Sequence, residues 1–243
     1  MDNLSLNNPV QANPIQEKIR NSSLELLRII AMVMIVFHHF AIHGGFDFTY
    51  AGITIPRLWY NFIIMGGKIG VDVFVMISGY FLITKDTLSL DLRRFVKLWK
   101  ELLFYALVLF LILKGLKYPA ANKDLFFRSI FPLTDNLWWF ATTYGQLCLI
   151  YPLLNHGLKA MSKIDFQKLL IGLFFLLSVI PTISTVRLWE SNLLWFIFLY
   201  CSAAYIRLYG LTPKLKLRHY VIALLVVGLF SYISTIVFSL LAI

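Results

Sequence analysis

Long apolar stretches separated by short polar segments make up most of the chain after residue 23. An α-helix that crosses the hydrocarbon core of a bilayer needs about 20 mostly apolar residues, at a rise of about 1.5 Å each. Backbone groups in lipid must be hydrogen-bonded within the segment, so each stretch is expected to be a helix. The pattern predicts an all-α fold, a polytopic transmembrane helical bundle. Its seven predicted spans are 24–43, 60–83, 101–116, 136–155, 168–186, 191–209 and 219–243.

The composition excludes a soluble protein. Hydrophobic residues make up 59% of the 243 residues and charged residues 14%, against roughly 45–50% and about 25% in soluble domains. The net charge of +10 would suit a nucleic-acid-binding protein. Membrane proteins collect Lys and Arg in cytoplasmic loops, however, so we expect a lipid bilayer around the chain and no nucleic-acid partner. Cys148 and Cys201 lack the spacing of metal ligands, and we expect no metal.

The distribution of Lys and Arg predicts the orientation. If the N-terminus is inside, fifteen Lys and Arg lie at the inner side and six at the outer side, with Lys68 inside a span. Cytoplasmic loops carry the excess of positive charge. We therefore predict a polar cytoplasmic tail over residues 1–23 and a transmembrane domain over residues 24–243, with the N-terminus cytoplasmic. Residues 1–19 lack the apolar region of a cleavable signal peptide.

Two ionisable residues of the first span share a helix face. Arg28 and His39 are 11 positions apart, which is about 20° beyond three full turns, so their side chains share a face. His38 points about 80° away from Arg28 around the helix axis. Ionisable residues within spans are costly and are candidates for function. We interpret Arg28 as the holder of an anion at the cytoplasmic mouth and His39 as a catalytic base deeper in the membrane. The alternative is that Arg28, paired with Glu25, anchors the helix and the histidines bond to other helices.

The second span contains Lys68 and Asp72, which are four positions apart and can neutralise each other. Alternatively, Asp72 orients a histidine of the first span and so acts with His39 in catalysis. Both interpretations account for a carboxylate that is expensive to keep in a membrane. Gly66 and Gly70 in the same span form a motif that lets two helices approach closely.

A basic cluster follows the second span. Its residues Arg93, Arg94 and Lys97 could bind the phosphates of a cosubstrate. The alternative is a plain anchor at the cytoplasmic surface, with Trp99 at the interface.

Aromatic residues begin the fourth predicted span. Trp138, Trp139 and Tyr144 are candidate substrate-binding residues, because rings and hydroxyls at this end of a span could contact a sugar. The alternatives are an aromatic belt at the membrane interface and packing between helices.

Three blocks of the chain, in order over residues 24–155, resemble the acyltransferase family 3 of integral membrane proteins. The first runs from Glu25 to His39 and contains the Arg and the His of the family. The second is Gly-Val-Asp-Val-Phe to Ser-Gly-Tyr-Phe over residues 70–81, followed by the two arginines at 93 and 94. The third runs from Leu-Trp-Trp-Phe at residues 137–140 to Tyr-Pro at residues 151–152.

The resemblance implies an enzyme of the bacterial plasma membrane that transfers an acyl group, usually acetyl from acetyl-CoA, to a hydroxyl of a surface carbohydrate. It implies that Arg28 and His39 are the functional pair. Its acceptor would be a carbohydrate or a lipid-linked glycan, and its partners would include proteins of capsule or exopolysaccharide assembly. Members have about ten spans, so the seven found here predict a C-terminally incomplete version of that fold.

The sequence leaves three other functions open. Some membrane domains of the family are associated with transport, which would make the chain a transporter or flippase. A truncated member could be inactive. A non-catalytic membrane partner of a polysaccharide assembly complex is the third. We expect an O-acetyltransferase that uses acetyl-CoA as a cosubstrate.

Overall fold

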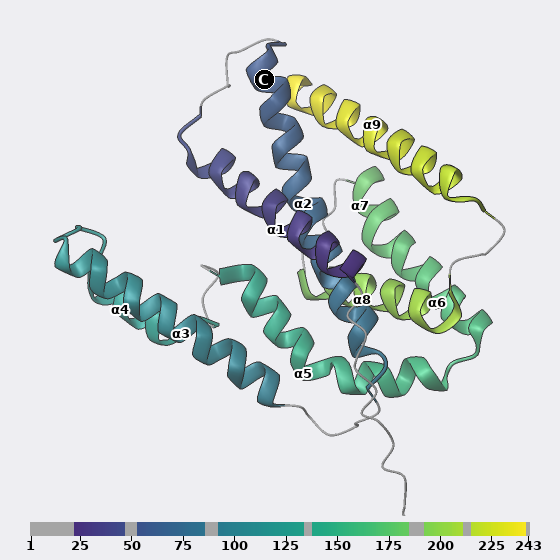
Figure 1. Cartoon of the computed structure of the whole chain (residues 1–243), viewed down its shortest axis with the longest axis horizontal. Helices are drawn as coiled ribbons and strands as arrows, with labels where there is room; N and C mark the ends of the chain where they lie inside the picture. The colour runs from purple at the N-terminus through teal and green to yellow at the C-terminus, as the bar shows by residue number, and fades with distance from the viewer. Residues whose placement is uncertain are drawn as a thin grey trace, which may run out of the picture.

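The computed structural model describes residues 22–46, 53–85, 92–133, 138–184, 192–210 and 215–241, with side chains to residue 238. Every regular element in these residues is a helix, as the sequence predicts (Figure 1). The predicted cytoplasmic tail lies outside the described residues, apart from its last two positions. The elements are α1 (Ser22–His43), α2 (Ile55–Leu82), α3 (Leu92–Gly115), α4 (Lys123–Ile130), α5 (Trp139–Ala160), α6 (Lys163–Phe174), the π-helical η2 (Phe175–Val179), α7 (Ile180–Ile183), α8 (Asn192–Tyr209) and α9 (Leu217–Leu241).

Five helical segments of the described chain, rather than the seven expected, are long and apolar enough to cross a membrane. They are Ser22–His43, Ile55–Leu82, Lys163–Ile183, Asn192–Tyr209 and Leu217–Phe238. The predicted spans 101–116 and 136–155 are α-helical over residues 101–115 and 139–155, but α3 begins nine residues earlier than expected and so includes the basic cluster. Helix α5 contains threonines, a glutamine and an asparagine among its apolar residues. A helix surrounded by protein can keep such residues, because its neighbours rather than lipid meet them.

Helices α2, α5 and α8 form the centre of the molecule and run in the same direction. Phe74 of α2 packs on Phe140 of α5 with ring centroids 5.7 Å apart, and Phe140 packs on Phe196 of α8 at the same distance. Near the other end of α2, Gly79 lies so close to α8 that an added Cβ would be 3.1 Å from the Cα of Tyr200. The buried core is shared by these three helices and α6, which adds Phe166. It consists of Val71, Val75, Leu82, Ile83, Leu147, Tyr151, Leu158, Phe166, Phe196, Leu199, Tyr200, Cys201 and Ala204.

The remaining apolar helices run antiparallel to this centre. Helix α1 crosses α2 at the glycines of the predicted close-approach motif, where a Cβ on Gly70 would lie 2.7 Å from the carbonyl oxygen of Ala31. Helix α6 lies against α8 through Gln167, which donates to the Tyr205 hydroxyl at 2.6 Å. Helix α9 returns to the start of α2, where the Tyr232 hydroxyl donates to the carbonyl oxygen of Leu58 at 2.8 Å (Figure 1). Successive long helices thus alternate in direction, as a chain that repeatedly crosses a bilayer requires.

The side of the membrane that each end of the bundle meets stays a prediction from the charge distribution. A cysteine that replaces Asp47 should react with an impermeant thiol reagent in intact cells, and one that replaces Asp86 should react only after permeabilisation, because the basic segments lie inside. Both positions lie outside the described residues. Labelling of the Asp86 position alone in intact cells would reverse the orientation.

A second prediction concerns the contact between α1 and α2. A Cβ on Gly67 would overlap the Cβ of His38. The Cβ of His38 is bonded directly to the backbone, so a change of side-chain rotamer cannot move it away. Gly67→Ala should therefore lower the free energy of unfolding by about 1–3 kcal/mol, as overpacking does. Gly172→Ala is the matched control, because a Cβ there meets no atom within 4 Å. Thermal unfolding in detergent measures both, and equal unfolding temperatures would contradict the close contact.

Candidate functional site

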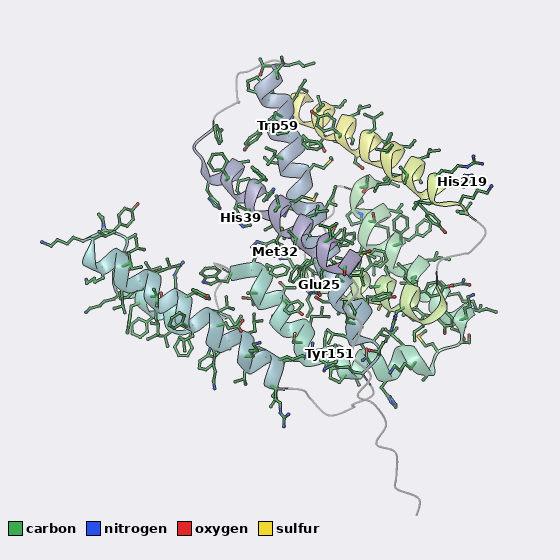
Figure 2. The ribbon with its side chains drawn as sticks, viewed as in Figure 1. Glu25, Met32, His39, Trp59, Tyr151 and His219 are labelled. Atoms are coloured by element: carbon green, nitrogen blue, oxygen red, sulfur yellow. The ribbon has the colours of Figure 1, made fainter. Side chains whose placement is uncertain are left out.

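Arg28 lies on α1 and forms the ion pair with Glu25 that its spacing allows. The distance from Arg28 Nη1 to Glu25 Oε1 is 3.2 Å, and the two side chains are 34% and 40% exposed. The guanidinium is therefore neutralised in part but is still open to a ligand. Figure 2 shows Glu25, Met32 and His39 in succession along this helix.

The two adjacent histidines of α1 have different surroundings. His38 faces α2, where its Nδ1 donates to the carbonyl oxygen of Ile64 at 2.9 Å. His39 is exposed, and its Nδ1 donates to the carbonyl oxygen of Ile35 in its own helix at 2.8 Å. A carbonyl oxygen only accepts hydrogen bonds, so Nδ1 of His39 bears a proton in this bond. In a neutral ring with this bond, Nε2 is the nitrogen that has the lone pair a base needs.

A third histidine, which was not predicted from the sequence as a site residue, extends this face. His43 follows His39 by four positions, and their rings stack with centroids 6.1 Å apart. The four-residue spacing is the signal that could have found it, since residues four apart are neighbours on a helix.

In the described part of the chain, Asp72 accepts a hydrogen bond from an indole. Trp195 Nε1 of α8 donates to Asp72 Oδ1 at 2.9 Å, and the carboxylate is partly buried between α2 and α8. Lys68 lies with its Nζ 5.3 Å from the ring centroid of Trp139 at the start of α5. Asp72 and Lys68 thus each contact a different tryptophan, and Lys68 is also near enough to Asp72 to act on it electrostatically. The role of Asp72 in catalysis with His39 stays a prediction.

The candidate substrate-binding residues lie at the junction of α2 and α5. Tyr144 stacks on Phe140 with centroids 6.0 Å apart, and its hydroxyl donates to Ser78 Oγ at 3.4 Å. Trp139 packs against Phe196 and under Lys68. The buried Nε1 of Trp138 has no hydrogen-bond partner in the described part of the chain. A buried donor without a partner is unusual and is available to a ligand oxygen.

The basic cluster divides into two faces of α3. Arg93 and Lys97 are exposed, and Lys97 lies 3.8 Å from Glu101. Arg94 is half-buried and lies near enough to act electrostatically on Tyr144 of α5. Of these three residues, Arg93 and Lys97 are displayed outward, while Arg94 faces the helix bundle.

A buried polar contact at the end of α2 was not predicted from the sequence. Asn155 of α5 is 3% exposed, and its Nδ2 donates to the carbonyl oxygens of Leu82 at 2.9 Å and Lys85 at 3.0 Å. The buried hydroxyl of Tyr200 donates to Asn155 Oδ1. These bonds add a second donor to two carbonyls at the end of α2, and they join α2, α5 and α8 at one point.

An all-helical chain with several apolar spans and ionisable residues inside them belongs to the class of multi-pass membrane proteins. A family model described as "Acyltransferase domain", that of acyltransferase family 3, matches residues 21–242. The chain belongs to this family, as the three blocks of the sequence indicate. No curated protein and no solved structure matches the chain.

Proposed function

We propose that this membrane acyltransferase is an O-acetyltransferase that moves an acetyl group from acetyl-CoA to a hydroxyl of a surface or exopolysaccharide sugar. The observation that supports this most directly is the placement of His39. Its ring is exposed on an apolar helix, and its bond to Ile35 uses Nδ1, so Nε2 is the nitrogen that can act as a base in the neutral ring. An ionisable side chain in a membrane-spanning helix is energetically costly, so it is a candidate for function. An imidazole there suits the removal of a proton from a hydroxyl.

Cationic side chains provide the donor site in this proposal. Arg28 is about one-third exposed and shares its helix face with His39, while Arg93 and Lys97 are exposed on α3. Phosphates of acetyl-CoA prefer such charged donors, and Arg offers a planar fork for them. Arg94 belongs to the same cluster and would support it from the bundle side.

The acyl transfer requires one proton to move. Nε2 of His39 would take the proton from the acceptor hydroxyl as its oxygen bonds to the thioester carbonyl carbon. The carbon–sulfur bond then breaks, and the same proton passes from His39 to the sulfur of CoA. Holding both reactants beside one imidazole supplies much of the acceleration, because a bimolecular step becomes effectively unimolecular.

Aromatic side chains around the start of α5 suit the acceptor. Trp139 and Tyr144 present ring faces and a hydroxyl, and Trp138 has a buried N–H without a partner in the described residues. Sugars combine apolar ring faces with hydroxyls, so aromatic rings and a few placed polar groups are typical of their sites. Asp72 would contribute to the same region indirectly, because it accepts a hydrogen bond from the indole of Trp195 and so orients that ring.

The experiment is a comparison of the surface glycan in cells with and without this gene. Base-labile acetyl groups on the glycan should be present with the gene and lost without it. Unchanged acetylation together with altered export of the glycan would favour a transporter or flippase in the plasma membrane. Loss of the whole polysaccharide, with no acetate difference per sugar, would favour a non-catalytic assembly partner.

A further inference from the structure

Lys68 and His39 occupy equivalent places on two antiparallel helices. His38 of α1 and Gly67 of α2 face each other at the closest approach of the pair, where there is no room for a Cβ on the glycine. His39 and Lys68 are the next residues on each helix, so they lie at the same depth. Each residue of an α-helix is rotated by about 100° about the helix axis from the one before it. In two antiparallel helices, the residues that follow the two facing residues are therefore rotated toward the same side of the pair. His39 and Lys68 therefore leave the contact on the same side.

The surroundings of Lys68 agree with this geometry. Its side chain is exposed near the middle of a helix long enough to span a membrane. The ammonium lies over the Trp139 ring and close enough to His38 and Asp72 to act on both electrostatically. A charge at this depth is expensive in lipid and typically lines a water-filled or ligand-filled space.

We infer that Lys68 is a further catalytic residue, which stabilises the negative charge that develops on the acyl carbonyl oxygen. This inference rests on the proposed acyl transfer by His39. The two residues lie at one depth and have complementary roles. His39 accepts the proton of the hydroxyl, and Lys68 stabilises the negative charge on the acyl carbonyl oxygen. Trp139 holds the long, flexible lysine by its ring face, as cation–π contacts do.

The step conserves atoms and charge. The acceptor oxygen forms a bond to the thioester carbon as its proton goes to His39 Nε2, and the carbon–oxygen π electrons become a lone pair on the carbonyl oxygen. Lys68 Nζ–H donates a hydrogen bond to that oxygen without losing its proton. The carbonyl re-forms as the carbon–sulfur bond breaks, and the thiolate takes the proton from His39.

The test uses the full chain in membranes, with acetyl-CoA as the probe and release of the CoA thiol as the readout. Lys68→Met keeps the length of the side chain and removes its charge. It should lower kcat about 100-fold, as loss of one oxyanion donor does, and leave the KM for acetyl-CoA within about 2-fold. Lys168→Met is the matched control, because Lys168 is exposed and pairs with Asp165 within its own helix. It should leave both constants unchanged.

A chemical rescue separates the charge from a packing role. Lys68→Cys alkylated with 2-bromoethylamine regains an ammonium at nearly the original position, and its kcat should rise at least 10-fold over the unmodified variant. Treated wild-type protein controls for Cys148 and Cys201, both of which are buried. Wild-type kcat in Lys68→Met, or failure of the alkylated variant to recover, would overturn the inference. Absence of thiol release by the wild type itself would instead overturn the proposed function.

Discussion

Replacing His39 with alanine is expected to abolish acyl transfer and to leave the amount of protein in the membrane unchanged. The side chain is exposed, so its removal leaves no cavity in the described core. Its one described hydrogen bond is to its own helix, whose backbone bonds remain. General base catalysis contributes typically 10²- to 10⁴-fold, and a loss in that range is expected in kcat.

His38→Ala is the matched control for this prediction. Both residues are histidines of the same helix turn, but His38 donates to Ile64 and faces α2, away from the reaction. Its loss should lower activity only in part, through packing and an interhelical hydrogen bond worth about 0.6 kcal/mol. Acetyl transfer from labelled acetyl-CoA, normalised to the protein detected in the membrane, measures both variants. Full activity in His39→Ala with loss in His38→Ala would contradict the assignment of the base.

The second large effect is expected on stability, at Asn155. Asn155→Leu keeps the volume of the side chain but leaves the buried Tyr200 hydroxyl and the carbonyls of Leu82 and Lys85 without this partner. A buried polar group left unsatisfied costs about 1–3 kcal/mol. We therefore expect the free energy of unfolding to fall by about 1–3 kcal/mol, because the Lys85 N–H still donates to the Leu82 carbonyl and Lys159 to the Lys85 carbonyl.

Two tyrosine variants of α8 calibrate this result. Tyr200→Phe removes only the hydroxyl bonded to Asn155 and should cost about 0.5–1.5 kcal/mol. Tyr205→Phe removes a hydroxyl bonded to the exposed Gln167 and should cost less than about 0.5 kcal/mol. Unfolding of each variant in detergent gives the ranking. Equal stability of Asn155→Leu and the wild type would show that the contact does not hold the end of α2.

The positions of the apolar helices could be predicted from the sequence because lipid imposes both length and composition on them. Prediction was poorer for α3 and α5. The basic residues at the start of α3 were placed before the span predicted to begin at residue 101, although Lys and Arg are good helix formers. The short helix α4 was not predicted. It follows the N-cap residue Asn122, whose side-chain oxygen accepts a hydrogen bond from the N–H of Leu125.

The common face of Arg28 and His39 follows from helix periodicity alone, because both residues lie on one helix. The partners of Asp72 and Asn155 could not be found in this way. Trp195 and Tyr200 are on α8, and no local spacing links them to residues of α2 or α5. Such pairs depend on which helices pack together, which a single sequence does not specify. The roles of Arg93, Arg94, Lys97, Trp138, Trp139 and Tyr144 in binding stay predictions.

Transfer of labelled acetyl from acetyl-CoA to glycan tests the proposed reaction most directly. Membranes with the wild-type chain, the His39→Ala variant or no added chain would be incubated with acetyl-CoA labelled in the acetyl group, and glycan-bound label and free CoA thiol would be counted. We expect equal amounts of bound label and released thiol with the wild type, and neither above background with the other two. Thiol release without label on the glycan would contradict a carbohydrate acceptor, and no release by the wild type would contradict acyl transfer from acetyl-CoA.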